Sequence, residues 1–342
     1  MGIKNLHTFL RKHVPHVYKE ISLTQFAYKH IAIDLSIYLC KYKALYKERW
    51  IDSFLSLMTC LRENEIHFVF ILDSKSPPEK DNEKKHRSLQ REKLRNRIIE
   101  MEKAFRLLLE KNEISPCIEK FFHPKNYHHE ASIQQVSTEI DRLKSNLLDI
   151  HMEDFTLIKQ LFDILQVPYY YAHGEAEATC SHLCKNGIVD AVMTEDTDIL
   201  AYGCPISLHK IDINNNTITM INMDYLLNEL NMNYSTFRDF CIMCGTDYNS
   251  NIPKIGSDRS YKLMKEHGCI ENIQNIVNIN ILNHHNVRRL FNNEIEYTIP
   301  KIYCGHPNTH DLQLFLFTNN CYFEIHRIIN AFCQPRQDII IC

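Results

Sequence analysis

The sequence contains no apolar run long enough to cross a bilayer and no N-terminal segment of the kind that directs secretion. Its longest apolar runs, such as FVFIL at 68–72, have the length of a buried strand. Thirteen cysteines are present, but their spacing forms neither a disulfide framework nor a paired zinc motif. We therefore predict an intracellular protein that is neither secreted nor attached to membranes.

The sequence also lacks a strong net charge, since its formal charge is −3 at pH 7. The total conceals an uneven distribution. Residues 75–111 contain twelve Lys or Arg against seven Asp or Glu, so the rest of the chain is correspondingly acidic. An acidic site next to a basic segment suits an enzyme that binds both metal ions and nucleic acid.

Acidic residues follow apolar runs at several places along the chain. Asp34 ends IAID and Asp73 ends FVFILD, and both runs have strand composition. In α/β proteins, sites form at the carboxyl ends of the strands, so acids placed there are expected to share one pocket. The complete set is Asp34, Asp73, Glu175, Glu177, Asp196, Asp198 and Asp247.

Seven carboxylates in one pocket would repel one another unless divalent cations neutralised them. Glu175 and Glu177 also suit the first turn of a helix, where the helix dipole favours anions, but this does not explain Asp34 and Asp73. All-oxygen ligands favour Mg²⁺, with Mn²⁺ as a substitute. The acids therefore predict metal-dependent phosphodiester chemistry.

A basic helix is predicted directly after the second of these acids. Residues 80–111 contain no Pro or Gly and are rich in strong helix formers. A basic row repeats along it at helical spacing, followed by an apolar stripe from Leu94 to Leu108. Because the row starts only seven residues after Asp73, its cations should stand near the metal site. The row is Lys80, Lys84, Arg87, Arg91 and Arg95.

The remaining pattern predicts an α/β fold with a mostly parallel sheet flanked by helices. Helices are expected at 3–13, 48–63, 137–165 and 311–334, a loop at 112–136, and strands at 30–34, 67–73, 167–172, 189–194 and 205–211. From about residue 223 the chain looks helical. His284 and His285 lie in a polar stretch without companion ligands, so surface positions are predicted for them.

The segment NIPKIGSDRSYKLMKEHG predicts a helix, a tight glycine turn and a second helix. Amides of such a turn and of the following helix N-terminus can hold a phosphate without reading base sequence. Lys254, Gly256 and Arg259 are the candidate DNA-binding residues in this turn.

Six ordered motifs resemble the flap endonuclease/XPG family of structure-specific 5′ nucleases over nearly the whole chain. They are MGIKNL, AIDLS, FVFILDSKSPPEK, GEAEATCSHL, AVMTEDTDILAYG and CGTDYNSNIPKIG. The resemblance implies a PIN-like nuclease core at 1–222 with a helical arch at about 76–150. It also implies a helical DNA-binding region at 223–342 with a helix–two-turn–helix (helix-hairpin-helix) element at about 237–268. The composition suggests a version from a large DNA virus.

The same resemblance implies roles for individual residues. The seven acids would be metal ligands, and Lys80 and Arg87 would be catalytic cations of the arch. Gly2 would lie at the substrate junction, and Tyr38 would stack on a base. A K⁺ ion would bind the carbonyls of Asn251, Ile252 and Ile255.

The chain departs from the family pattern in three places. Lys254 occupies the first position of the usual Gly-Ile-Gly turn, the arch region is longer than usual, and Gln313 lacks the downstream aromatic pair of a sliding-clamp motif. We expect a monomer that binds DNA and possible replication proteins, in the nucleus or at a viral replication site in the cytoplasm.

The expected reaction is two-metal-ion hydrolysis of DNA at 5′ flaps and double-strand/single-strand junctions, in replication, repair or recombination. A 5′-3′ exonuclease, a recombination or break-repair nuclease and an RNase stay open, because they would share this chemistry. A non-catalytic nucleic-acid-binding scaffold and a metal-dependent phosphatase are the more distant alternatives.

Overall fold

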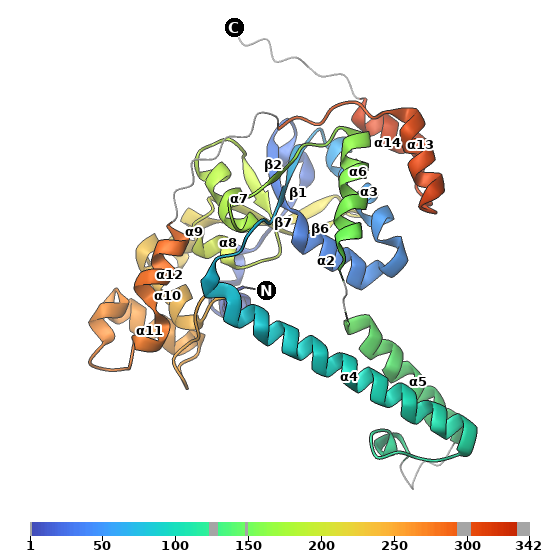
Figure 1. Cartoon of the computed structure of the whole chain (residues 1–342). Helices are drawn as coiled ribbons and strands as arrows, with labels where there is room; N and C mark the ends of the chain where they lie inside the picture. The colour runs from blue at the N-terminus through green and yellow to red at the C-terminus, as the bar shows by residue number, and fades with distance from the viewer. Residues whose placement is uncertain (1, 123–128, 148–149, 293–301, 334–342) are drawn as a thin grey trace.

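A seven-stranded sheet forms the centre of the protein (Figure 1). The computed structural model describes residues 2–122, 129–147, 150–292 and 302–333. Strand order is β1-β7-β6-β5-β2-β3-β4, and the last five strands in this order run parallel while β7 is antiparallel to both of its neighbours. The strands are β1 (Lys19–Ser22), β2 (His30–Asp34), β3 (His67–Leu72), β4 (Tyr169–Tyr171), β5 (Ala191–Met193), β6 (Ile206–Asp212) and β7 (Thr217–Asn222).

Alternating side chains on the central strands build two apolar cores, one on each face of the sheet. Ile31 and Ile33 of β2 and Phe70 of β3 face one core, whereas Ala32 and Val69 face the other. Successive residues of a strand point to opposite faces, so continuous apolar runs are required where both faces are covered. The sequence IAID and FVFIL satisfies this requirement.

Helices cover both faces. The core behind Ile31 and Ile33 takes side chains from α2 (Leu35–Tyr46), α3 (Trp50–Glu63), α6 (Met152–Leu165), α13 (Thr309–Thr318) and α14 (Ile325–Phe332). The core behind Ala32 takes them from α1 (Leu6–His13), α7 (Ala176–Lys185), α8 (Asp198–Ala201), α9 (Met223–Leu230), α10 (Tyr234–Cys244), α11 (Ser257–His267) and α12 (His284–Phe291). Short 3₁₀ turns lie at Pro15–Val17, Leu23–Phe26, Lys47–Arg49, Pro78–Lys80, Glu119–Phe121, Ile270–Ile273 and Asn280–Leu282.

Side-chain caps determine where several helices begin. Asn222, Asn233 and Asn308 each accept a hydrogen bond from a backbone N–H in the first turn of α9, α10 and α13, respectively. Asp34 caps α2 in the same way, through the N–H of Ile37. These caps satisfy donors that the helix leaves unpaired. Thus the first acid of the site also starts the helix that follows it.

Two helices project from the body as a long hairpin (Figure 1). They are α4 (Asp81–Lys111) and α5 (His129–Asn146), and they pack on each other through a small core of their own that includes Met101, Leu108 and Val136. The basic helix is confirmed. The loop predicted at 112–136 is wrong from His129 onward, because apolar residues of that stretch pack on α4.

The single helix predicted at 137–165 is also wrong. α5 ends at Asn146 and α6 begins at Met152. Asp154 accepts a hydrogen bond from the backbone N–H of His151, which starts a new helix there. The break lets α5 belong to the projecting hairpin while α6 packs on the sheet.

Strands β1 and β7 and helix α2 were not predicted. β1 is a short edge strand whose side chains are exposed or half-buried, so it has little of the alternation that marks a strand. The alternation across β6 and β7 is interrupted by a register shift between His209 and Asp212. Tertiary pairing, rather than local pattern, determines these elements.

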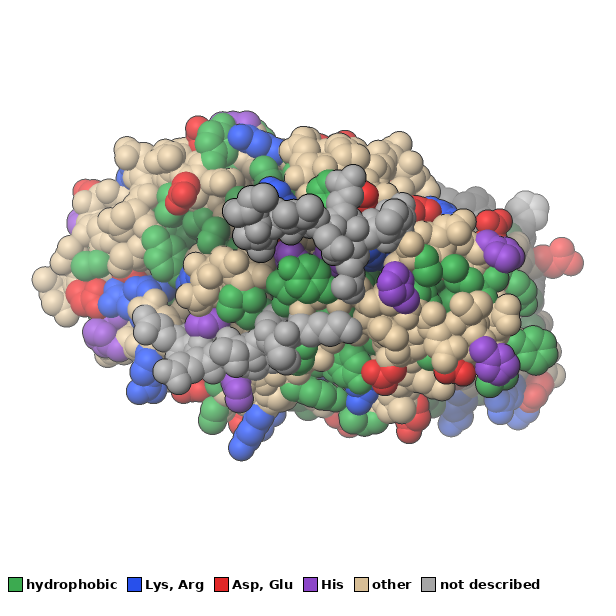
Figure 2. All heavy atoms as spheres, turned by 90° about the horizontal axis from the view of Figure 1, so that it is seen from above, with side chains coloured by type: hydrophobic (Ala, Val, Ile, Leu, Met, Phe, Trp, Pro, Cys, Tyr) green, Lys and Arg blue, Asp and Glu red, His purple; other side chains and the backbone are tan. Residues whose placement is uncertain are grey.

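The described residues after 222 do not form a separate core. Helices α9 to α12 share the core of α1 and α7, whereas α13 packs on α6 and α14 packs on α3. None of the helices within the described ranges is long and apolar enough to span a membrane. Figure 2 shows the side above Figure 1, where apolar side chains form separate patches across the face and Lys and Arg are scattered.

Candidate active site

Three parallel strands bring predicted acids to one edge of the sheet. Asp34 is the last residue of β2, Asp73 directly follows β3, and Asp196 lies three residues after β5. Since β2 pairs with both β3 and β5 in parallel, their carboxyl ends lie together. Glu175 and Glu177 open α7, Asp198 opens α8, and Asp247 follows α10.

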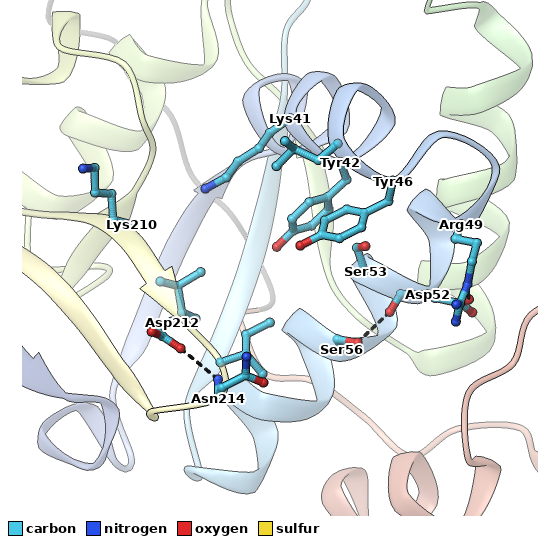
Figure 3. Close-up of a pocket in the computed structure, with 13 residues that line it drawn as sticks. Lys41, Tyr42, Tyr46, Arg49, Asp52, Ser53, Ser56, Lys210, Asp212 and Asn214 are labelled. Atoms are coloured by element: carbon cyan, nitrogen blue, oxygen red, sulfur yellow. Dashed lines mark hydrogen bonds and ion pairs between the residues drawn. The ribbon is translucent and has the colours of Figure 1, made fainter. Parts of the chain in front are cut away.

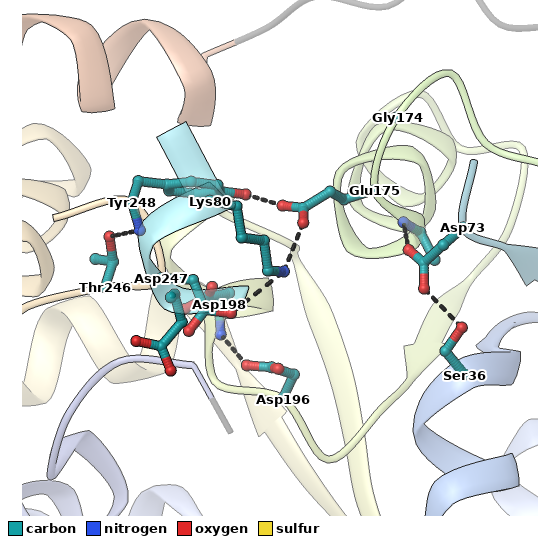
Figure 4. A network of polar contacts seen from close by, with 12 residues as sticks. Ser36, Asp73, Lys80, Gly174, Glu175, Asp196, Asp198, Thr246, Asp247 and Tyr248 are labelled. Carbon is teal, nitrogen blue, oxygen red and sulfur yellow. Dashed lines mark hydrogen bonds and ion pairs between the residues drawn. The ribbon is translucent and has the colours of Figure 1, made fainter. Parts of the chain in front are cut away.

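Local hydrogen bonds hold the acids in place. Asp73 accepts from the hydroxyl of Ser36 at 2.6 Å and from the backbone N–H of Ala176 at 2.8 Å, so it ties β3 to the start of α7 (Figure 4). Asp196 accepts from the backbone N–H of Asp198 at 3.0 Å. Asp73 is exposed, but the other six acids are buried.

Burial makes ionisation of this cluster unfavourable. It raises the pKa of Asp34, Glu177 and Asp198 well above the usual range, and the charges of neighbouring acids raise each of them further. Oδ1 of Asp198 is buried and has no hydrogen-bond donor among the described residues. Divalent cations that prefer oxygen ligands would neutralise such a carboxylate cluster and would bind its unpaired oxygen.

Two cations at the start of the projecting hairpin, one in the turn before α4 and one in α4, reach into the same cluster. The Nζ atom of Lys80 lies 2.5 Å from Glu175 and 3.2 Å from Asp247 (Figure 4). Arg87 binds both oxygens of Asp247, at 2.8 and 2.9 Å. Burial alone would lower the pKa of Lys80, but Glu175, Glu177 and Asp247 outweigh it and raise the pKa. Lys80 therefore stays charged beside the acids.

The start of the chain lies against the acids as well. A Cβ atom at Gly2 would lie 2.0 Å from Asp196 and 2.8 Å from Asp198, and Gly2 has φ +82°. The next residue, Ile3, donates its N–H to Thr197 at 2.8 Å. Only glycine fits this approach, because any side chain would displace two carboxylates. The structure thus brings Gly2 to the acids.

We expect the stability of the metal-free protein to fall as pH rises. Acids whose pKa is higher in the folded state hold their protons more tightly when folded, so the free energy of unfolding decreases as pH rises above their unfolded pKa of about 4. At pH 7, Mg²⁺ at a hundredfold excess over its Kd should restore about 2.7 kcal/mol. Thermal unfolding with Mg²⁺ and with EDTA, from pH 5 to pH 8, measures both effects.

Asp198→Asn is the control variant for this prediction, because it removes one of the repelling charges without changing side-chain size. It should unfold at a higher temperature than the parent chain in EDTA and should gain less from Mg²⁺. An unfolding temperature of the parent protein that changes neither with pH nor with Mg²⁺ would contradict a shared cation site.

Comparison with known proteins places this site in a family. A model of the XPG N-terminal domain matches residues 1–94, and a model of the XPG I-region matches residues 166–247. Over 330 residues the chain is 32% identical to the probable RAD2-like endonuclease 076L of Invertebrate iridescent virus 3, with 85% of each protein covered. The chain belongs to the XPG family. Nucleases of this family are metal-dependent, in agreement with the acid cluster.

Other XPG-family proteins resemble the chain in sequence or in fold. Flap endonuclease 1 of Cryptosporidium parvum is 30% identical over 304 residues, which cover 80% of this chain and 56% of that protein. The catalytic core of Rad2 in complex with DNA substrate superposes with a TM-score of 0.64 at 18% identity, covering 96% of this chain and all of that one. Flap endonuclease-1 from Methanococcus jannaschii superposes at 0.62 with 19% identity, covering 92% and 96%. The predicted fold class is confirmed.

A tyrosine pair behind the acids was not predicted from the sequence. The hydroxyl of Tyr248 donates to Oε2 of Glu175, and the hydroxyl of Tyr202 lies 2.6 Å from that of Tyr248. Lys80 holds the other oxygen of Glu175, so the carboxylate is fixed from both sides. The signal was available, since Tyr248 directly follows Asp247 in CGTDY.

Tyr248→Phe should lower kcat about tenfold and raise the Mg²⁺ concentration needed for half-maximal rate, because Glu175 loses its second hydrogen bond. Tyr202→Phe keeps that bond and is the matched control. Rates measured against Mg²⁺ concentration test the difference. Equal effects of the two variants would show that the pair contributes only to packing.

The base-stacking role predicted for Tyr38 is not supported. Its ring is fully buried against Tyr42, so it offers no face to a base. The exposed ring in this segment is Tyr46, which lines a pocket of about 840 Å³ between α2, α3 and the β6–β7 hairpin (Figure 3). Lys41 and Lys210 line the same pocket, but Asp52 and Asp212 line it as well, so its charge is mixed.

The basic row of α4 divides between the site and the solvent. Lys80 and Arg87 reach the acids, as described above. Arg91 lines a pocket of about 930 Å³ with α2 residues that include Ile37 and Cys40, while Lys84 and Arg95 are exposed. The row thus runs outward from the acid cluster along α4.

The segment predicted as helix, tight glycine turn and helix is helical only in its second half, as α11. The helix before it, α10, ends at Cys244, and the non-helical residues 245–256 separate the two helices. Lys254, Gly256 and Arg259 are exposed, and Lys254 has φ +65°, the conformation that favours the glycine usual at this position. The carbonyls of Ile252 and Ile255 converge, since the side-chain amide of Asn251 donates to both, at 3.3 and 3.1 Å.

The surface position predicted for His284 is wrong, whereas the one predicted for His285 is confirmed. His284 is buried at the start of α12, His285 is exposed, and Glu271 lies close to both. Glu271 is thirteen residues from His284 in sequence, which is why spacing did not reveal the contact. By contrast, Cys241 and Cys244 are free, buried thiols of α10, as predicted.

Proposed function

We propose that the protein is a structure-specific DNA endonuclease that hydrolyses phosphodiester bonds at 5′ flaps and double-strand/single-strand junctions. One observation carries the proposal: an acidic cluster of metal-ligand type and two cations from a projecting basic helix meet at one point. A phosphatase would need the acids but not the arch. A binding scaffold would need the arch but not all of the acids.

The acids and the cations have different tasks in this proposal. Asp34, Asp73, Glu175, Glu177, Asp196, Asp198 and Asp247 hold two Mg²⁺ ions, for which Mn²⁺ substitutes. These ions supply an activated water and neutralise the leaving oxygen when bound. Lys80 and Arg87 leave their carboxylate partners and contact the scissile phosphate, where they stabilise the charge of the transition state.

Two surfaces of the protein bind the DNA backbone in this proposal. The outward cations Lys84, Arg91 and Arg95 contact the single strand or the duplex backbone. Lys254, Gly256 and Arg259 hold a duplex phosphate at the turn before α11, with K⁺ at the carbonyls of Asn251, Ile252 and Ile255. Residues 1–222 then form the nuclease core and residues 223–342 contribute the duplex contacts. Such binding depends on salt and not on base sequence.

The protein acts as a monomer on DNA inside the cell, in the nucleus or at a viral replication site. Residues 311–320 contain Gln313 without a following aromatic pair, so no sliding-clamp motif supports a clamp partner.

Cleavage of end-labelled substrates with Mg²⁺ tests the proposal. The panel contains a 5′ flap, a nick, a blunt duplex, single-stranded DNA and an RNA flap, each also incubated with Asp198→Asn. Cleavage concentrated at the flap junction is the expected result. Stepwise release of nucleotides from duplex ends would replace the assignment with a 5′-3′ exonuclease, and no cleavage of any substrate would overturn it.

A further inference from the structure

A second cluster of metal-binding side chains lies in the C-terminal helices, apart from the acids. Glu271 is in the 3₁₀ turn Ile270–Ile273, and His284 and His285 begin α12. One ligand atom from each of the three lies within 4.8 Å of the others. Nε2 of His284 is 3.2 Å from Oε1 of Glu271, and Nδ1 of His285 is 3.8 Å from the same oxygen.

His284 is the buried member of this cluster. Its side chain is 8% exposed, and its Nε2 atom lies 3.2 Å from Oε1 of Glu271 without forming a regular hydrogen bond within the described parts of the chain. Burial and the neighbouring His285 lower the pKa of His284, although Glu271 opposes this effect. The proposal rests on geometry, since ligand atoms of the two imidazoles and the carboxylate come together at one point.

We propose that Glu271, His284 and His285 form a binding site for a divalent transition metal of the zinc type. Two imidazoles and one carboxylate are a common zinc ligand set, with water or substrate in the fourth position. Imidazole nitrogens favour zinc, whereas all-oxygen clusters favour magnesium. The two clusters of this protein therefore differ in the metal they select.

Arg288 lies beside this site, and its contacts explain how a metal is accommodated. Its guanidinium binds both oxygens of Glu271, at 2.5 and 2.8 Å, and also binds the buried Asp239. The negative charge of Asp239 balances the positive charge of Arg288. The negative charge of Glu271 therefore remains available to a metal ion. Binding requires Arg288 to release Oε1 of Glu271 while it keeps Oε2, as outer-shell partners of ligating carboxylates do.

Helix α12 also contacts the turn that precedes α4. Asn286, one residue after His285, donates to Glu79 at 2.7 Å, and Glu79 precedes Lys80 in the turn that starts the arch. A metal that joins Glu271 to the first turn of α12 would hold this helix against the base of the arch. Metal binding should therefore stabilise the segment that positions Lys80.

Cobalt binding in a large excess of Mg²⁺ tests the proposal, because Mg²⁺ fills the all-oxygen site and leaves the histidine site to Co²⁺. Titration of the full chain should give one bound Co²⁺ per protein with visible absorption of a four- or five-coordinate ion. The thiolate charge-transfer band should be absent, which excludes binding to the free cysteines. Zn²⁺ should compete for the same site.

Variants identify the ligands. His285→Ala removes an exposed ring and should keep the fold, and it should weaken Co²⁺ binding roughly a hundredfold. His284→Ala should abolish binding, and His310→Ala, which removes an exposed histidine of α13, should leave it unchanged. Zn²⁺ should raise the unfolding temperature of the parent chain and not that of His285→Ala. Unchanged Co²⁺ binding in His285→Ala, or no binding by the parent chain, would overturn the proposal.

Discussion

Asp198→Asn is expected to lower cleavage by about a thousandfold or more while leaving DNA affinity within about threefold. The buried Oδ1 of Asp198 has no partner among the described residues, and the proposed function assigns a metal ion to it. Asparagine keeps the size of the side chain but removes the charge that holds the ion. A thousandfold loss corresponds to about 4 kcal/mol of transition-state stabilisation.

Single-turnover cleavage of a flap substrate and binding in Ca²⁺ measure the two quantities separately. Asp190→Asn is the matched control, because Asp190 is a more exposed acid at the opposite end of β5, where it pairs with His30. It should retain parental activity. Turnover by Asp198→Asn with Mg²⁺ at near-parental rate would remove Asp198 from the set of metal ligands.

Lys80→Ala combined with Arg87→Ala should reduce turnover by about three to four orders of magnitude and affinity by less than tenfold. In the absence of DNA both cations are held by carboxylates of the site, Lys80 by Glu175 and both by Asp247. A scissile phosphate between the metals and these cations would take over their contacts. Their effect is therefore expected in the transition state and not in general attraction to DNA.

Lys103→Ala with Arg106→Ala removes the same charge from the exposed far part of α4 and is the control for that attraction. The two double variants should be compared in saturating Mg²⁺, because removal of Lys80 also leaves the acids less neutralised in the metal-free protein. If both double variants lower kcat and DNA affinity in equal proportion, Lys80 and Arg87 contribute only to general DNA binding.

The strands that carry the first acids could be predicted because their signal is local. IAID and FVFILD are continuous apolar runs that end in an acid, and a strand buried on both faces needs that pattern. The basic helix was equally visible, since its spacing is a property of one segment. The edge strand β1 was missed because its side chains are exposed or half-buried and its partner β7 is distant in sequence. β7 was missed although it pairs with the preceding β6, because a register shift interrupts the alternation there.

The same distinction separates the two metal clusters. The acids of the active site lie in motifs that each follow a strand or open a helix. Because sites in α/β proteins form at the carboxyl ends of the strands, the local pattern predicts that these acids meet. Glu271 comes from a 3₁₀ turn and the pair His284 and His285 from the start of α12, and no periodicity of the sequence describes how these two elements meet. The contact between Asn286 and Glu79 joins residues more than two hundred positions apart in the same way.

The sequence by itself determined the α/β class, the acidic set, the basic helix and the family, because each depends on residue types at short spacing. Only the tertiary structure decided that α5 packs on α4 in the projecting hairpin, that Tyr38 is buried, and that Tyr248 holds Glu175. These depend on packing between distant segments, where the free energy comes from burial and hydrogen bonds that a short window of sequence does not contain.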